Sequence, residues 1–258
     1  MAKLNVSHLK NIPETLLIPL YYKSLLTKER NPVITDNDAV KIVEGIDYDF
    51  TKFNANKATL TGVASRTIIF DMIVKEWLSD HPKGIIVNIG AGLDTRPLRF
   101  TDARWYNIDL PESIEVREKF ITSGETNIAK SAFDFTWMDI IPEKENVLFI
   151  CEAVLFFFSE NDVRSLFQAI AANFTNSQFA FETAPHFAVK RMKVNNNPLK
   201  WSNQNLSDVT KWSPKLKPLA TYSLIDYARK KWSLFFRLLV KLMPQLRKGY
   251  KIGVISIK

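Results

Sequence analysis

The chain has 258 residues, 46% of them hydrophobic, so it is long and apolar enough to bury one sizeable core. Its single cysteine, Cys151, excludes a disulfide framework, and no apolar run reaches the ~20 residues that span a bilayer. The net charge of +8 is unevenly distributed, because residues 186–258 carry 16 basic and 2 acidic residues (+14), whereas the other 19 basic and 25 acidic residues sum to −6.

Residues 1–80 are expected to form a helical cap, because this part of the sequence contains no convincing strand. Residues 15–26 are strongly apolar and predict a helix that begins or kinks at Pro19. A shorter helix is expected over residues 38–44. Residues 64–78 repeat apolar side chains at helical spacing, which predicts an amphipathic helix.

Arg66 lies near the beginning of this last helix, where a cation does not complement the helix dipole. A charged side chain in such a position often has a specific partner. An ion pair within the protein and the carboxylate of a ligand are both consistent with Arg66, and this segment alone favours the ion pair.

Residues 84–99, with the sequence GIIVNIGAGLDTRPLR, are the centre of the predicted fold. The β-branched run 85–87 leads into Gly90 and Gly92, a pattern typical of a buried parallel strand followed by a tight turn. Glycines let the backbone bend and let a ligand approach without meeting a Cβ atom. Ligands of open α/β sheets bind past the carboxyl ends of such strands, so this turn is the expected binding site.

Two ligands suit this turn, a dinucleotide and S-adenosylmethionine. A dinucleotide site favours a third glycine beside the pyrophosphate, whereas this chain has Thr95 there, preceded by Asp94. A carboxylate repels a pyrophosphate and attracts a sulfonium or an ammonium group, so Asp94 favours S-adenosylmethionine. Asp109, at the end of the next predicted strand, has the spacing of an acid that binds ribose hydroxyls, but both ligands use such an acid.

From residue 84 onward, predicted strands alternate with helices, which is typical of a doubly wound α/β fold with a parallel sheet. Acidic residues follow four of these strands, at Asp94, Asp109, Asp134 and Glu152. Because the carboxyl ends of parallel strands meet at one edge, the four are expected to lie together. The predicted strands cover residues 85–87, 104–109, 127–133, 146–151, 178–181 and 250–257. One helix is predicted over residues 111–121, and a second begins with a capping box at Ser159 and ends at about residue 174.

The C-terminal part combines polar and basic segments. Residues 185–220 have poor periodicity, which indicates a loop or lid. Residues 232–243 are an apolar helical segment with Arg237 and Lys241 one turn apart, and packing on the sheet is expected in preference to lying on a membrane surface. The positive charge of residues 186–258 indicates a solvated face, or contact with an acidic lipid surface or substrate. Nucleic acid is not expected, because no nucleic-acid-binding module accompanies the charge.

Four motifs, GAGLDTRPLRF, WYNIDLPESIEVREKF, SAFDFTW and CEAVLFFF, occur in this order and resemble the leucine carboxyl methyltransferase family. They are most similar to its bacterial branch, the tetracenomycin-type polyketide O-methyltransferases, and the resemblance covers residues 14–183. It implies a class I S-adenosylmethionine-dependent methyltransferase fold: a seven-stranded, mostly parallel, Rossmann-like sheet whose last strand is antiparallel. The N-terminal helices would cap the cofactor, and the methyltransferase domain would cover residues 81–258, with a basic C-terminal lid or substrate segment.

The resemblance also implies roles for individual residues. Arg66 would pair with the methionine carboxylate of the cofactor, and Gly90 would line the approach to the methionine part. Gly92 and Asp94 belong to the same cofactor-binding turn. Asp109 would hold the ribose hydroxyls.

Further along the chain, Asp134 and Phe135 would bracket the adenine, with Asp134 accepting a hydrogen bond from the adenine amino group. Glu152 would lie near the methionine ammonium or the site of methyl transfer. The chain departs from the family pattern in two places: Ala153 replaces a glycine where the backbone approaches the cofactor, and the phenylalanines at 156–158 stand where the family often has a pair that includes tyrosine.

The predicted function is methyl transfer from S-adenosylmethionine to an oxygen, and a carboxylate of a small apolar molecule, such as a secondary metabolite, is the expected acceptor. A carboxylate is ionised at pH 7 and needs no general base, so no catalytic residue is assigned and no metal is expected. Protein carboxyl methylation is the alternative reaction, and a non-catalytic S-adenosylmethionine sensor is the alternative of another class. The single cysteine and the lack of a signal peptide's hydrophobic region indicate a cytoplasmic protein, whose oligomeric state is left open.

Overall fold

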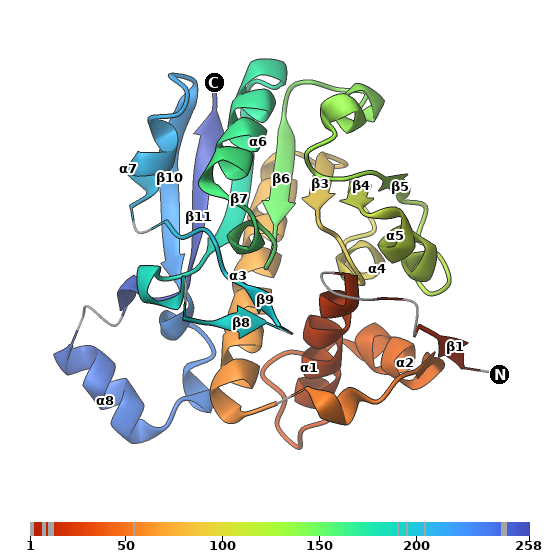
Figure 1. Cartoon of the computed structure of the whole chain (residues 1–258), viewed down its shortest axis with the longest axis vertical. Coiled ribbons are helices and arrows are strands. Elements are labelled where there is room, and N and C mark those ends of the chain that lie inside the picture. Colours follow the sequence, from red (N-terminus) through yellow and green to blue (C-terminus); the bar gives the residue numbers. More distant parts are fainter. Residues whose placement is uncertain are drawn as a thin grey trace.

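The computed structural model describes residues 3–6, 9, 13–53, 55–189, 191–194, 196–203, 205–243 and 247–258, and its centre is a seven-stranded sheet (Figure 1). The strand order is β10-β11-β7-β6-β3-β4-β5. The five strands from β7 to β5 in this order are parallel, and β11 is antiparallel to both of its neighbours. The predicted α/β fold, with its antiparallel C-terminal strand, is confirmed. The strands are β3 (Ile85–Ile89), β4 (Arg104–Asp109), β5 (Thr126–Ala129), β6 (Val147–Cys151), β7 (Ser177–Thr183), β10 (Leu216–Ser223) and β11 (Lys251–Ile257).

The two central strands, β3 and β6, are buried along their whole length. Helices cover both faces of the sheet at this point, so both sides of each strand must be apolar, which explains the continuous hydrophobic runs. Helix α3 (Lys57–Asp80) packs on one face through residues such as Phe70 and Val74. Helix α6 (Glu160–Asn173) covers the other face.

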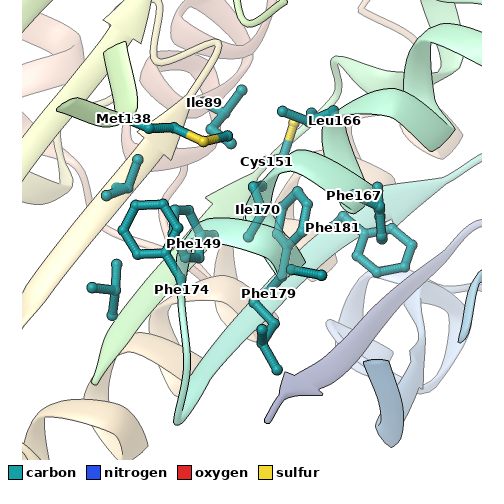
Figure 2. Packing of buried hydrophobic residues seen from close by; sticks show 14 of the residues in the cluster. Ile89, Met138, Phe149, Cys151, Leu166, Phe167, Ile170, Phe174, Phe179 and Phe181 are labelled. Carbon is teal, nitrogen blue, oxygen red and sulfur yellow. The ribbon is translucent and has the colours of Figure 1, made fainter. Parts of the chain in front are cut away.

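The face beneath α6 holds the aromatic core of the protein (Figure 2). The rings of Phe149 on β6 and Phe174, the C-cap residue of α6, meet edge to face with their centroids 4.8 Å apart. Phe167 contacts Phe181 on β7 in the same manner at 4.9 Å. The predicted capping box at the start of α6 is present, because the Ser159 hydroxyl and the Asp162 carboxylate each accept a hydrogen bond from the other residue's backbone N–H.

The N-terminal residues form a cap beyond the carboxyl ends of the parallel strands (Figure 1). Its helices are α1 (Leu17–Thr27) and α2 (Asn37–Gly45), with the first half of α3 packed against them. Pro19 lies in the first turn of α1, where its missing N–H costs no helical hydrogen bond. Four short elements complete this region: η1 (Pro13–Leu16), η2 (Phe50–Lys52) and the paired strands β1 (Leu4–Asn5) and β2 (Ile46–Asp47).

Several element boundaries differ from the sequence prediction. Strand β5 ends at Ala129, four residues before the predicted end, and the chain then turns into η3 (Phe135–Ile140). Within the predicted loop over residues 185–220, the structure contains the short helix α7 (Leu206–Thr210) and the beginning of β10. Because β10 is an edge strand, it tolerates Pro218 and a bulge beside it, and it therefore lacks the apolar pattern of a buried strand.

The remaining elements are short. They are α4 (Arg96–Arg99), α5 (Pro111–Arg117), α8 (Leu234–Leu242), the hairpin of β8 (Lys193–Val194) and β9 (Asn197–Pro198), and the 3-10 turns η4 (Leu155–Phe157), η5 (His186–Ala188), η6 (Leu224–Asp226) and η7 (Arg229–Lys231). Within the described ranges, none of the helices has the length and apolar character needed to cross a membrane.

Helix α8 contradicts the expectation that it packs on the sheet. It lies at the edge of the molecule, away from the strands (Figure 1), and Val240 is its one buried residue. The sequence prediction was wrong because it assumed that an apolar helix must find a partner in its own chain.

Candidate functional site

A cavity of about 860 Å³ lies between the sheet and the cap, at the carboxyl ends of the parallel strands. The turn after β3 and the end of β4 form its floor, and the segment after β6 forms one wall. Helices α1 and α3 close it from the cap side. Of the residues predicted to bind the cofactor, six line this cavity: Arg66, Gly90, Gly92, Asp94, Asp109 and Glu152.

The turn after β3 needs glycine at position 90 for two reasons. Gly90 has a φ of +70°, which side chains other than that of glycine rarely accommodate. A Cβ atom there would also lie 2.3 Å from Cγ2 of Val154, in the neighbouring wall. The turn and the wall after β6 are therefore closely packed, with no room for a side chain at position 90.

Asp109 is held at the end of β4 by two backbone donors. The N–H of Gly92 donates to its Oδ2 and the N–H of Leu110 donates to its Oδ1, each at 2.7 Å. Burial raises the pKa of this carboxyl, and the hydrogen bonds from Gly92 and Leu110 only partly oppose that effect. Asp109 thus presents a rigidly placed carboxyl to the cavity.

Asp94 is already neutralised by cations of the same chain. The Arg96 guanidinium lies 2.8 Å from its Oδ2, the Asn88 side-chain amide donates to the same oxygen at 2.9 Å, and Lys23 lies 3.9 Å from Oδ1. Burial by itself would raise the pKa of Asp94, but the charges of Arg96 and Lys23 outweigh burial and hold it low. The sequence argument from the charge of Asp94 did not include these cations of the same chain, and contact of Asp94 with the cofactor remains a prediction.

Arg66 joins the cap helix α3 to two acids of the sheet edge. Its Nε lies 3.0 Å from Oε1 of Glu152, and its Nη1 donates to Oε2 of Glu182 at 3.0 Å. The ion pair within the protein, one of the two predicted partners of Arg66, is thus present. Contact of Arg66 with a ligand carboxylate remains a prediction.

Glu152 and Glu182 differ in their protonation behaviour although both contact Arg66. Burial favours the neutral form of Glu152, yet Arg96, 2.8 Å away, and Arg66 together lower its pKa. Burial dominates at Glu182, whose side chain is 2% exposed, and raises its pKa despite the contact with Arg66. The sequence analysis did not identify Glu182 as a cavity residue, although its position at the end of a predicted strand was a usable signal.

A second group of ion pairs lies behind the glycine turn and was not predicted. Arg99 contacts Asp71 on α3 at 2.8 Å and Asp36, the N-cap residue of α2, at 3.3 Å. Arg96 also contacts Asp71, at 2.7 Å. The two arginines of the DTRPLRF motif therefore link the turn to the cap. Their spacing of three residues on a helical turn was the signal in the sequence.

Two predicted adenine contacts do not line the cavity. Asp134 lies at the surface, where its carboxylate accepts hydrogen bonds from the backbone N–H and hydroxyl of Thr136 at the start of η3. Phe135 packs against the core beneath α6. The residues of this segment that reach the cavity are Ser131 and Ala132.

The wall after β6 departs from ordinary backbone geometry at Ala153, which has a φ of 61°. This is the position at which the family resemblance led us to expect glycine, and a left-handed conformation explains that preference. Phe156 and Phe157, farther along the same wall, are buried and also line the cavity. They therefore contribute both to the core and to the site.

The comparison with known families decides the identity of this fold. The model of the family described as leucine carboxyl methyltransferase matches residues 8–171, more than half of the chain. The chain belongs to this family. The sequence-based assignment to the leucine carboxyl methyltransferases is thus confirmed, and the family is one of methyltransferases that use S-adenosylmethionine.

A curated relative in this family is the tetracenomycin polyketide synthesis O-methyltransferase TcmP of Streptomyces glaucescens. It is 25% identical over 179 residues, which are 67% of this chain and 66% of that protein. The match therefore spans slightly less than two thirds of the relative's length. It supports the predicted relationship to the tetracenomycin-type branch.

Solved structures confirm the class I methyltransferase fold. Magnesium protoporphyrin IX methyltransferase from Synechocystis PCC 6803 with bound SAH has a TM-score of 0.54 at 11% identity, over 86% of this chain and 93% of that chain. The same enzyme with bound SAM has a TM-score of 0.51 at 13% identity, over 82% and 86% of the two chains.

Proposed function

We propose that this chain is an S-adenosylmethionine-dependent O-methyltransferase whose acceptor is the carboxylate of a small, largely apolar molecule. One observation carries the proposal. In a member of the leucine carboxyl methyltransferase family, the glycine turn and Asp109 form the floor of a cavity at the carboxyl ends of β3 and β4.

The floor of the cavity suits the nucleoside part of the cofactor. The bare backbone at Gly90 allows close approach, because no Cβ atom intervenes. Asp109 already accepts hydrogen bonds from two backbone N–H groups and from the side chain of Ser113. An ionised carboxylate has about four acceptor positions, so one ribose hydroxyl can bind directly and a second can replace the Ser113 hydroxyl.

The charged residues beside the floor suit the methionine part, which carries an ammonium and a carboxylate group. A wall of one sign would repel one of these groups. The wall here is of mixed sign, with Glu152 and Arg66 side by side, and their mutual contacts hold both side chains in place. Glu152 would face the ammonium group and Arg66 the carboxylate.

When bound, S-adenosylmethionine supplies a methyl group on a positively charged sulfur. The acceptor carboxylate is anionic at neutral pH, so the chain needs no general base to activate it. The residues of the cavity contribute by holding the acceptor oxygen in line and by excluding water, which would otherwise solvate the carboxylate.

The lining of the cavity also includes aromatic side chains and two cations outside the ion pairs described above, and we assign these residues to the acceptor. Phe156 and Phe157 line it from the wall after β6, and Trp232 and Tyr250 line it from the C-terminal part of the chain. Lys52 and Lys193 are lining residues as well and supply positive charge for a carboxylate. An apolar acid matches this combination.

Transfer of tritium from the methyl group of S-adenosylmethionine tests the proposal directly. The chain is incubated with the labelled cofactor and cell extract, and the products are separated into small molecules and protein. We expect label in the small-molecule fraction that mild base releases as volatile methanol, because a methyl ester hydrolyses and a methyl ether does not. Base-labile label on protein would instead identify protein carboxyl methylation, and tight cofactor binding without any transfer would identify a sensor.

Asp109 provides a quantitative test of the cofactor site. Replacing it by Asn removes the charge and sets a side-chain NH2 group against one of the two backbone N–H donors. The melting temperature is therefore measured alongside to establish that the variant is folded. We expect the affinity for S-adenosylhomocysteine to fall about 10- to 100-fold in calorimetry, the worth of hydrogen bonds to a charged group. Asp139→Asn, at an exposed position outside the cavity, is the control. Equal affinities for the wild type and Asp109→Asn would contradict the ribose assignment.

A further inference from the structure

Helix α8 is apolar on both of its sides, although one side faces solvent. The exposed fractions are 75% for Leu234, 74% for Phe235, 54% for Leu238 and 71% for Leu242. At 100° per residue these four side chains lie on one continuous arc of the helix surface, while Val240 on the opposite side is buried. A helix that is hydrophobic all round is normally buried, so α8 exposes a surface that needs a partner.

Basic residues lie beside this exposed arc. Arg237 and Lys241, both exposed, are one helical turn apart along its edge, and the exposed Lys230 and Lys248 lie in the flanking segments. Residues 186–258 contain two acids, Asp208 and Asp226. Each is already paired with a basic residue of this region, so neither compensates the charge around α8.

From these observations we infer that α8 docks on an anionic phospholipid bilayer, with Leu234, Phe235, Leu238 and Leu242 inserted at the level of the headgroups. The helix has nine residues and is about 13 Å long, so it lies in the plane of the membrane and does not span it. Arg237 and Lys241 extend from the edge of the apolar arc to the lipid phosphates.

The positive charge around α8 favours an anionic bilayer as its partner over a second copy of the chain. Two copies that met through α8 would bring two strongly basic regions together, and the like charges would oppose the association. An anionic bilayer offers the complementary charge and an apolar interior in the same place. The combination of an apolar arc and flanking lysine or arginine is the composition of interfacial helices.

The position of α8 gives this docking a consequence for the cavity. Leu224, Ile225 and Trp232, in the segment that leads into α8, are among the residues that line the cavity. A bilayer bound at α8 would lie beside the cavity rim, and an apolar acid dissolved in it would reach the site without crossing water. This consequence rests on the proposed function, whereas the binding to lipid does not.

Vesicle flotation tests the docking without cofactor or substrate. The wild-type chain is mixed with vesicles of phosphatidylcholine alone and with vesicles containing about 30% phosphatidylserine. We expect binding to the anionic vesicles that weakens at high salt, because exposed charges are screened. Absence of binding, or equal binding to neutral and anionic vesicles, would overturn the proposal.

Variants separate the two components of the binding. Phe235→Ser with Leu238→Ser should reduce partitioning more than tenfold, because two exposed apolar anchors are lost. Arg237→Gln with Lys241→Gln should reduce it about 30-fold on anionic vesicles, at about fivefold per charge. Ile140→Ser removes an exposed apolar residue at the end of η3 and should bind as the wild type does. All four replaced α8 residues are exposed, so these variants should fold.

Two outcomes distinguish this proposal from its rivals. The wild-type chain could fail to bind vesicles and instead self-associate in a way that Leu238→Ser abolishes. That result would show that α8 contacts a second copy of the chain, and it would overturn the proposal. Vesicle binding by a chain that transfers no methyl group would support the docking while the proposed function failed.

Discussion

Ala153 is strained at the centre of the site. Its φ of 61° places an L side chain in the left-handed region, directly after Glu152 and in contact with the cavity. The conformation costs roughly 1–2 kcal/mol relative to right-handed backbone. The surrounding wall, held through Val154 against Gly90 and through Glu152 against two arginines, imposes it.

Replacing Ala153 by Gly should therefore stabilise the protein. The relief of strain is partly offset by the greater freedom of glycine in the unfolded chain, so we expect a gain of about 0.5–1 kcal/mol in the free energy of unfolding by urea. Ala169→Gly, the same substitution within helix α6, should have the opposite sign and cost about 1 kcal/mol. A loss of stability in Ala153→Gly would show that the left-handed backbone is not strained.

At the scale of elements, helices α6 and α8 both begin with a serine N-cap but differ in how much of their surface is buried. Ser159 caps α6, whose buried face includes Val163, Leu166, Phe167 and Ile170, and Ser233 caps α8, which buries one residue. A helix that packs on the core unfolds with the whole domain, whereas an exposed helix can fray by itself.

The two caps should therefore respond differently to the same change. Ser159→Ala should lower the free energy of global unfolding by about 1 kcal/mol and the melting temperature by about 2–4 °C, since the cap is lost from a helix that belongs to the core. Ser233→Ala should leave the global transition unchanged. Amide hydrogen exchange should report faster exchange confined to α8 in that variant, and a matching drop in melting temperature would contradict the picture of α8 as an independent element.

At the scale of the whole molecule, ion pairs connect the cap to the sheet around the cavity. Arg66 on α3 reaches Glu182 on β7, 116 residues away in sequence, and Arg99 reaches Asp36 in the cap. Both acids are 2% exposed, and nearby cations oppose the cost of burying them: Arg66 at Glu182, and Lys23 together with Arg99 at Asp36. These contacts close the cavity and also determine its pattern of charge.

Arg66→Met tests this coupling. It leaves Glu182 buried without its cation, and we expect a loss of about 3–5 kcal/mol in the free energy of unfolding at neutral pH, more than half of it recovered by adding Glu182→Gln. Arg104→Met breaks an exposed ion pair with Glu143 and should cost less than about 0.5 kcal/mol. Similar losses in the two arginine variants would show that the Arg66 contacts matter no more than a surface pair.

The same variant should acquire a distinctive pH dependence. Burial already raises the pKa of Glu182, and removal of Arg66 raises it further. The folded chain then keeps a proton that the unfolded chain releases near pH ~4.3, so the stability of Arg66→Met should fall as the pH rises from that value through the raised pKa. Urea midpoints measured at about pH 5 and pH 8 should differ more in Arg66→Met than in the double variant.

The sequence by itself determined the parts of this protein that depend on neighbouring residues. The capping box at Ser159 and the glycine turn after β3 were predictable because a hydrogen-bonded cap and a positive φ are local requirements. The parallel α/β class followed from the alternation of apolar runs with helices, and the family motifs supplied the antiparallel C-terminal strand, whereas the edge strand β10 was not predicted.

Only the tertiary structure decided which charges and apolar faces are paired. The charge of Asp94 was expected to attract a cationic ligand, but folding brings Arg96 and Lys23 of the same chain to it. Arg66 likewise meets Glu182 only when α3 packs against β7. Helix α8 has the same apolar character as a core helix, and its exposure depends on where the chain leaves β10. Electrostatic pairing and burial act through space between segments that are far apart in the sequence. The sequence pattern therefore identifies the residues, but their partners depend on the tertiary structure.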